Sequence, residues 1–358
     1  MRIGIDGRKI PEADKRGPLD SLDHGKSFGM AGLFYRTVLD MSPTLDKGEL
    51  RAIRSRADEL GMYVETGLGK VNPYATPEAP ELRLMGNGDT LAGFRRMMEA
   101  CADIGCQELW IGTANYKTVY AGKWAYDRFR TDVDWPEQLR ATEVFLKKLA
   151  PIARDLGIHM NMETHEEITS FEILRLIEAV GEDVMGVVLD TLNPMQRAEH
   201  PVWAVRRVAP YVRQTHIKDA YLAHMAGGIT VQARACGDGV VDFREVLKLL
   251  AAHNPTINLS LECAGPRPAD FVPRHTLVEV FDPHWLASHP DLTLEEYAAF
   301  LDMVQRYESR IASGEVPTWD AYVTAPFGYA EAIATIQKST AHLRALCAEL
   351  DIPLEAAA

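Results

Sequence analysis

Four side chains that could bind a metal ion or move protons stand at the ends of strand-like runs in the second half of the chain. They are Glu163 after HMNM, Asp190 after VMGVVL, His216 within VRQTHIK and Glu262 after INLSL. Three converging carboxylates would repel one another unless a cation or shared protons compensate. Two glutamates, an aspartate and a histidine suit a divalent cation, and the oxygen-rich set favours Mn²⁺. The residues therefore predict a metal centre for Mn²⁺, with Mg²⁺, Co²⁺ and Zn²⁺ as alternatives.

Two further polar side chains lie beside this ligand set. Side chains two residues apart on a strand share a face, so His165 is expected to point the same way as Glu163. By the same rule Lys218 accompanies the histidine ligand two residues before it. His165 and Lys218 are then candidates for proton transfer, with Glu163 and Glu262 as fallback bases. The alternatives are a helix-capping or dipole role for His165 and an ion pair with Asp219 or another carboxylate for Lys218.

Two residues in the first half of the chain are candidate substrate contacts. Arg36 and Glu65 lie near the ends of the second and third strand-like runs. Either side chain could bind substrate hydroxyls at the same end of a parallel sheet. The alternative for each is a surface ion pair.

Short apolar runs alternate with amphipathic stretches along most of the chain. The predicted strands cover residues 2–6, 32–37, 62–66, 108–112, 159–164, 184–190, 212–218 and 257–262. The predicted helices include 47–60, 88–104, 135–156, 169–181 and 242–253. Eight strand–helix repeats predict parallel strands that close into a (β/α)₈ barrel. The rival, a doubly wound sheet, would normally begin with a GxGxxG turn, which GIDGRKIPEAD does not match.

One region departs from this rhythm. Residues 264–327 form a long excursion after the eighth predicted strand, with a helix over 293–312, before a last helix over 328–350. Loops after barrel strands lie on the catalytic face. We therefore expect one domain over residues 1–358, in which the excursion is either a cap or partner-docking surface on that face or a packed structural segment.

Composition excludes several classes of protein. A net charge of −13 argues against a nucleic-acid groove. No apolar run approaches the roughly 20 residues of a membrane span. The five cysteines are scattered without CxxC spacing, and the start MRIGIDGRKIPEAD lacks the apolar core of a signal peptide. We expect a cytoplasmic enzyme with reduced thiols that binds neither nucleic acid nor membrane.

The motifs around the four ligands resemble those of the xylose isomerase-like barrel superfamily. They are ETH at 163–165, DTLN at 190–193, HIKD at 216–219, GDGVVDF at 237–243 and the strand-end Glu262. The superfamily includes sugar isomerases, keto-sugar epimerases, inosose dehydratases and relatives of endonuclease IV. The resemblance implies a metal held by Glu163, Asp190, His216 and Glu262.

The resemblance also separates the branches of this superfamily. Keto-sugar epimerases use the first and last glutamates as an acid–base pair and usually carry a histidine three residues after the aspartate. Here that position is Asn193, a departure from their pattern, and Asn193 becomes a candidate substrate contact. Endonuclease IV relatives need further histidines and a basic surface, which this acidic chain does not supply.

Three features resemble the catalytic α subunits of bacterial C-glycoside deglycosidases. They are the N-terminal run over residues 3–46, the ExH motif at 163–165 and the excursion over 264–327. That likeness implies a carbon–carbon lyase acting on 3-oxo-C-glycosides, a sugar substrate with an aromatic aglycone, and a small β subunit in a hetero-oligomer.

A ketone on the sugar acidifies the adjacent C–H, and a metal on the carbonyl oxygen stabilises the enolate. His165 is the expected base at C2. Expulsion of the aglycone from C1 completes an elimination. The alternatives are a metal-dependent epimerase, isomerase or dehydratase of keto-sugars or keto-inositols, and a non-enzymatic sugar-binding or scaffold subunit.

Overall fold

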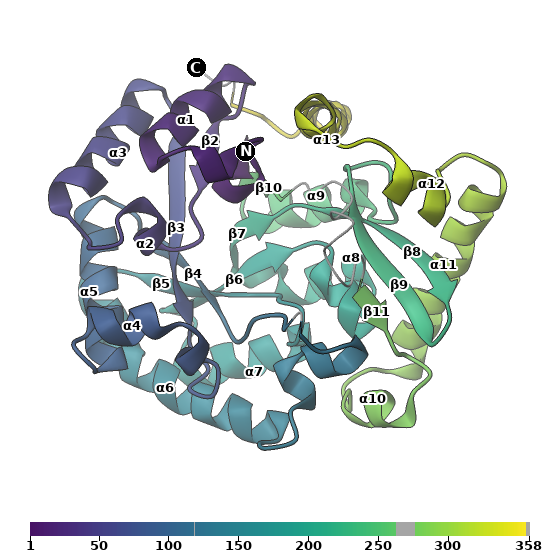
Figure 1. Ribbon diagram of the computed structural model, residues 1–358, viewed down its shortest axis with the longest axis horizontal. Helices are drawn as coiled ribbons and strands as arrows, with labels where there is room; N and C mark the ends of the chain where they lie inside the picture. Colours follow the sequence, from purple (N-terminus) through teal and green to yellow (C-terminus); the bar gives the residue numbers. More distant parts are fainter. Residues whose placement is uncertain (118, 263–275, 356–358) are drawn as a thin grey trace.

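The computed structural model describes residues 1–117, 119–262 and 276–355. Its central sheet runs in the order β10-β1-β2-β3-β4-β5-β6-β7, and all neighbouring strands are parallel. The strands are β1 (Arg2–Asp6), β2 (Gly32–Phe34), β3 (Tyr63–Lys70), β4 (Glu108–Gly112), β5 (His159–Glu163), β6 (Met185–Asp190), β7 (Val212–His216) and β10 (Asn258–Leu261). The N–H of Ile217 donates to the carbonyl of Ser260 at 2.8 Å, which joins the two edges. The predicted (β/α)₈ barrel is confirmed (Figure 1).

Most helices surround the sheet on its outer side, and those over residues 283–324 lie to one side of it (Figure 1). The helices are α1 (Pro18–Ser27), α2 (Val38–Met41), α3 (Lys47–Glu59), α4 (Pro80–Met85), α5 (Thr90–Asp103), α6 (Trp135–Leu156), α7 (Ser170–Val180), α8 (Pro201–Val208), α9 (Phe243–His253), α10 (Pro283–Ala287), α11 (Leu294–Ala312), α12 (Trp319–Thr324) and α13 (Tyr329–Glu349). The bounds of α6 match the prediction because both ends carry local signals. The carboxylate of Asp134 caps the first turn through the N–H of Glu137, and Gly157 ends the helix at φ 65°.

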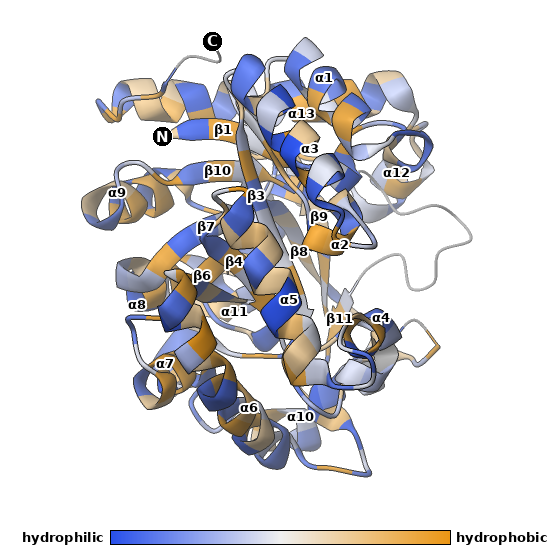
Figure 2. Ribbon diagram, turned by 90° about the vertical axis from the view of Figure 1, so that its left-hand side faces the viewer, coloured by the Kyte–Doolittle hydropathy of each residue, from blue (hydrophilic) through white to orange (hydrophobic). Residues whose placement is uncertain are grey.

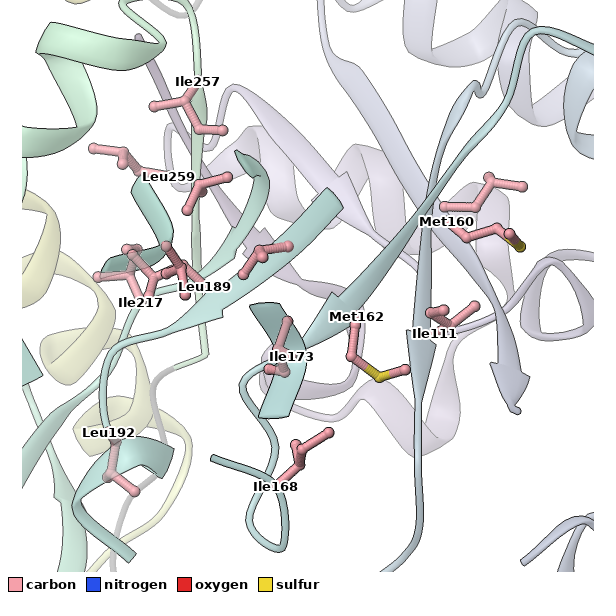
Figure 3. Close-up of a cluster of buried hydrophobic side chains, with 14 of the residues drawn as sticks. Ile111, Met160, Met162, Ile168, Ile173, Leu189, Leu192, Ile217, Ile257 and Leu259 are labelled. Atoms are coloured by element: carbon pink, nitrogen blue, oxygen red, sulfur yellow. The ribbon is translucent and has the colours of Figure 1, made fainter. Parts of the chain in front are cut away.

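Hydropathy decides which face of each element is buried. Along β5, Met160 and Met162 pack in the apolar layer between strands and helices, together with Ile173 of α7 (Figure 3). The intervening Asn161 points into the barrel, where its Nδ2–H donates to Oε1 of Gln214 at 3.2 Å. Orange and blue residues mix along α5 and α6, as expected for helices that bury one face (Figure 2). Alternation along β5 therefore turns Glu163 inward, on the side of Asn161.

The strand predicted over 212–218 was wrong at its end, and a small sheet follows it. β7 stops at His216, and β8 (Asp219–Met225), β9 (Gly228–Arg234) and β11 (Thr276–Val278) form an antiparallel sheet. The carboxylate of Asp219 accepts the N–H groups of Ala220, Gly237, Gly239 and Val241 at 2.8–2.9 Å. One buried side chain thus closes the base of the hairpin, an arrangement that strand–helix periodicity does not reveal.

The strand predicted over 62–66 is present, but its predicted end was wrong. β3 continues to Lys70, with a register shift between Gly67 and Gly69 where it pairs with β4. The two glycines resemble a strand end in the sequence, but here they form an irregularity inside the strand. Glu65 consequently lies near the beginning of β3.

Helices α10 and α11 pack against α8 and the segment that follows β6. Oε1 of Glu296 in α11 is 2.9 Å from Nη2 of Arg207, and Trp285 stacks on His289 beneath Arg197. Residues 264–275 of the predicted excursion lie outside the described residues, and a cap over the catalytic face remains a prediction. After α13 the N–H of Glu355 donates to the carbonyl of Met1, beside β1. Within the described ranges, the structure contains no helix with the length and apolarity to cross a membrane.

Candidate metal centre and active site

The four predicted ligands meet at the carboxyl end of the barrel. Each offers one ligand atom, and these atoms of Glu163, Asp190, His216 and Glu262 lie within 4.8 Å of one another. The first three side chains are buried and the fourth is half-buried. Strand register explains the meeting, because Asp190 pairs directly with His216 across β6 and β7, and Glu163 is the last residue of β5.

Hydrogen bonds fix the orientation of the Glu163 carboxylate. The indole Nε1–H of Trp110 donates to Oε2 at 2.7 Å, and the Nδ1–H of His216 donates to Oε1 at 3.0 Å. Trp110 and Phe34 form a small buried cluster with Val188, and Phe34 presents its ring edge-on to His216 with centroids 4.6 Å apart. The ligands therefore stand on an apolar base that restricts their rotamers.

Two ammonium groups accompany the carboxylates. Nζ of Lys218 lies 2.6 Å from Asp190 and 2.9 Å from Glu262, and Nζ of Lys9 lies 3.4 Å from Glu262. Of the two alternatives for Lys218, the ion pair is present, and its partners are these two carboxylates. Asp219 is instead engaged by the hairpin.

The charges at the site depend on one another. Burial disfavours the ionised form of Glu163. The nearby cationic groups of His216, His165 and Lys218 nevertheless hold the pKa of Glu163 well below its usual value. Burial likewise opposes protonation of His216, and Glu163 raises its pKa. Against its own burial, Lys218 has a raised pKa because of Asp190 and Glu262.

The residues fit a divalent cation. Ligand atoms at bond lengths near 2.1 Å are separated by at most about 4.2 Å across an octahedral ion, so atoms already within 4.8 Å need only small movements. Three carboxylate oxygens and one imidazole nitrogen form a donor set that hard divalent ions accept. The donor set does not discriminate Mn²⁺ from Mg²⁺, Co²⁺ or Zn²⁺.

His165 belongs to a second hydrogen-bonded group beside the ligands. Its Nδ1–H donates to Oε2 of Glu167 at 2.6 Å, and the hydroxyl of Thr113 donates to Oε1 of the same carboxylate. Glu167 is fully buried. With Nδ1 occupied as a donor, Nε2 of His165 is the ring nitrogen left to accept a proton.

A hollow of about 430 Å³ joins these groups. Its lining includes three of the ligands, Glu163, His216 and Glu262, and four other predicted site residues, His165, Lys218, Arg36 and Asn193. Arg36 donates to Oδ1 of Asn115 at 3.2 Å and lies over the ring of Trp110. The backbone N–H of Asn193 donates to Oδ1 of Asp190 at 2.9 Å. The residues at the strand ends and in the segments just after them thus bring seven predicted site residues to one cavity.

Glu65 lies elsewhere, which corrects its predicted place. It lines a hollow at the amino ends of the strands with Arg2 and Asn258. Its carboxylate accepts hydrogen bonds from Asn258 at 2.8 Å and Ser260 at 3.0 Å. The cause is the length of β3, which places Glu65 early in the strand and Lys70 at its end.

Sequence reasoning missed Trp110, Glu167, Lys9 and Arg8. Glu167 follows His165 by two residues, and this short spacing was the available signal. Trp110 is the third residue of β4, and only the folded barrel shows that it reaches Glu163. Arg8 and Lys9 follow β1 in a short 3-10 helix, and neither residue type nor spacing marked them as site residues.

Comparisons with known proteins agree with this fold. A profile of the family described as Xylose isomerase-like TIM barrel matches residues 22–279. The chain is 31% identical over 94 residues to the protein YihM of Escherichia coli K12, covering 26% of this chain and 29% of that protein. It is 24% identical over 238 residues to a 3-oxo-isoapionate decarboxylase of Pectobacterium atrosepticum, covering 65% of this chain and 72% of the decarboxylase.

Solved structures share the barrel. The D-psicose 3-epimerase of Clostridium cellulolyticum H10 superposes with a TM-score of 0.57 at 15% identity, over 86% of this chain and 99% of the epimerase. At this identity the likeness concerns the fold.

Proposed function

Because the chain belongs to the xylose isomerase-like TIM barrel family, we propose that it is a divalent-metal-dependent lyase that cleaves the carbon–carbon glycosidic bond of 3-oxo-C-glycosides. The observation that carries this proposal is the convergence of four ligand atoms within 4.8 Å, in a cavity that also contains His165. The cavity is lined mostly by polar side chains, as a sugar requires.

Glu163, Asp190, His216 and Glu262 would hold the divalent cation. When bound, the ion supplies a Lewis acid that polarises the ketone of the substrate. Lys218 offsets charge on Asp190 and Glu262 and favours the ionised form of each, although burial still raises the pKa of Asp190 to about 6.

His165 is the preferred base. Glu163 and Glu262 would both be ligands of the cation, and in addition Glu163 accepts the indole N–H of Trp110 and both oxygens of Glu262 face ammonium groups, so each carboxylate is a weak base. Nε2 of His165 accepts the proton of C2 and the C–H electron pair passes toward the carbonyl. The pair then forms the C1–C2 double bond as the C1–aglycone bond breaks, and the aglycone carbon takes one proton. The products are an unsaturated 3-oxo-sugar and the free aromatic compound.

A decarboxylase of a 3-oxo acid is a second candidate. It is favoured by the 24% identity to 3-oxo-isoapionate decarboxylase and by two guanidinium groups, of Arg8 and Arg36, that line the cavity and could bind a carboxylate. Loss of carbon dioxide would leave the same kind of enolate. An epimerase, isomerase or dehydratase would differ in the fate of that enolate.

The test uses the full chain loaded with Mn²⁺ and a 3-oxo-C-glucoside of a phenol. We expect release of the phenol, measured by chromatography, and exchange of H2 in D₂O, measured by NMR. The variant His165→Ala should lose about 10²–10⁴-fold in kcat while retaining metal. The matched control His253→Ala, at the end of α9, should behave as wild type.

Each alternative predicts a different product. A new sugar diastereomer would indicate an epimerase, and carbon dioxide from a 3-oxo sugar acid would indicate a decarboxylase. Absence of both H2 exchange and phenol release in the metal-loaded chain would contradict the proposed lyase.

A small β subunit, a hetero-oligomer and a cytoplasmic location also remain predictions. A small reading frame next to this gene, whose product co-purifies with the chain, is the expected support for the partner.

A further inference from the structure

A second hollow lies beside the catalytic cavity. It has a volume of about 380 Å³ and lies between the loop after β1 and the first turns of α13. We call it the apolar hollow because most of its exposed wall is apolar. The apolar side belongs to Pro11, Phe327, Tyr329, Ala332 and Ile336, and the rest of the wall to Gly328 and to the polar residues Arg8, Lys9, Glu12 and Thr335. Its chemistry contrasts with that of the polar catalytic cavity.

Arg8 and Lys9 connect the two spaces. Arg8 lines both hollows, and Lys9 lines the apolar hollow while its Nζ lies 3.4 Å from Oε1 of Glu262. The buried Asp6 holds Arg8 through its backbone N–H and through Nη2, each at 2.7 Å. Arg8, held by these hydrogen bonds, lies between the two spaces. A ligand at Glu262 therefore has the apolar hollow as its neighbour.

The aromatic side chains of the apolar hollow are exposed. Phe327 is 41% and Tyr329 47% accessible to solvent, although both stand next to a cavity. Tyr329 is oriented by His24, whose Nε2 lies 3.4 Å from its hydroxyl. A planar apolar group placed here would cover both rings and lie near the guanidinium of Arg8, which favours an aromatic ring over an aliphatic chain.

We propose that the apolar hollow is the subsite for the aromatic aglycone of a glycoside whose sugar occupies the catalytic cavity. This inference rests on the proposed function and names where the leaving group is bound. The spaces of about 430 Å³ and 380 Å³ together match the size of a two-part ligand. A small sugar acid, the substrate type of a decarboxylase, would leave the apolar hollow empty.

Binding of two unreactive probes to the metal-loaded full chain tests the subsite. The probes are 4-(β-D-glucopyranosyl)phenol and methyl β-D-glucopyranoside, measured by calorimetry. We expect the aryl glucoside to bind about tenfold more tightly than the methyl glucoside, equal to ~1.4 kcal/mol. Phe327→Ala should remove most of this preference and leave the Kd of the methyl glucoside unchanged.

A second variant and a matched control keep the result interpretable. Ala332→Trp fills the apolar hollow and should weaken the aryl probe selectively. Phe281→Ala removes another exposed aromatic ring that lines neither hollow and should change neither Kd. Equal affinities for the two probes in wild type, no detectable binding of either, or equal effects of Phe327→Ala on both would each overturn the proposal.

The outcome is separable from that of the proposed function. A chain that exchanges H2 of a 3-oxo-glucoside but binds both probes alike retains the enolate chemistry and lacks the subsite. A chain that prefers the aryl probe but exchanges no proton has the subsite, and then the lyase proposal fails.

Discussion

At the carboxyl end of the barrel, two buried carboxylates and one half-buried carboxylate face an imidazole and two ammonium groups. At the amino end, by contrast, Glu65 accepts its hydrogen bonds from the neutral donors Asn258 and Ser260. Burial acts on both sets. At the carboxyl end the cationic partners hold the pKa of Glu163 and of Glu262 below the usual value, and only Asp190 has a pKa that burial raises, to about 6. At the amino end burial prevails and raises the pKa of Glu65 to about 7.

The difference shows what distinguishes a candidate site from a buried acid. A carboxylate at a strand end needs charge compensation to stay ionised, and a metal site is built from carboxylates that stay ionised. Glu65 is satisfied by uncharged groups in the barrel interior. The variants below test whether the two ends behave as differently as their partners suggest.

The largest effect is expected from removing a ligand at the carboxyl end. Asp190→Asn should lower metal content and reduce activity about 10³-fold or more, because polarisation of the ketone is worth several kcal/mol. Metal analysis and product release measure the two effects. Chelation of the wild-type metal should have the same consequence and be reversed by Mn²⁺. Glu65→Gln is the control at the other end, and its metal content should equal that of wild type.

The next effect is the pH dependence of stability caused by Glu65. Its folded-state pKa of about 7 lies above the ordinary 4.5, so the folded state holds the proton more tightly. The resulting stabilisation is fully present below pH 4.5 and is lost as the pH rises through 7. The total is on the order of 3 kcal/mol.

Glu65→Gln should remove much of this pH dependence. Between pH 5 and pH 8 the variant should therefore lose less unfolding free energy than wild type. Urea unfolding at pH 5 and pH 8 measures it. If wild type and variant lose the same stability between these two values, Glu65 is not the group responsible.

A smaller effect is expected from the carboxylate that orients His165. Glu167→Gln weakens the hold on Nδ1 of His165 and should reduce kcat about 10–100-fold, with metal content unchanged. Glu178→Gln, on the exposed side of α7, is the matched control. A fall confined to KM would indicate that Glu167 serves substrate binding and would contradict its positioning role.

Local patterns located the four candidate ligands well and their surroundings poorly. Glu163 and Asp190 end apolar runs, so the strand ends and the shared face followed from periodicity, and the structure brings them together with His216 and Glu262. The predicted position of Glu65 at a strand end was wrong, because β3 continues through Gly67 and Gly69, two residues that are typical of strand ends.

Contacts between distant parts of the chain could not be predicted. Trp110 donates a hydrogen bond to a carboxylate 53 residues away, and Lys218 forms ion pairs with Asp190 and Glu262 rather than with its neighbour Asp219. These contacts form only in the closed barrel, because they depend on distances across its interior. The β8–β9 hairpin escaped prediction for a similar reason, since Asp219 organises it through backbone groups up to 22 residues away.

The smallest effect is expected from a half-exposed ion pair at the amino end. Nη1 of Arg213 lies 3.3 Å from Oε1 of Glu108, and both side chains are about one-third exposed. Glu108 has other partners, since His159 lies 3.2 Å away and Asn161 donates at 3.1 Å. Arg213→Met should therefore cost less than about 1 kcal/mol and leave activity unchanged. Thermal unfolding at low and high salt measures this, and the small difference should shrink further in high salt. A loss of activity here would mean that the two ends of the barrel are coupled, and the contrast between them would no longer hold.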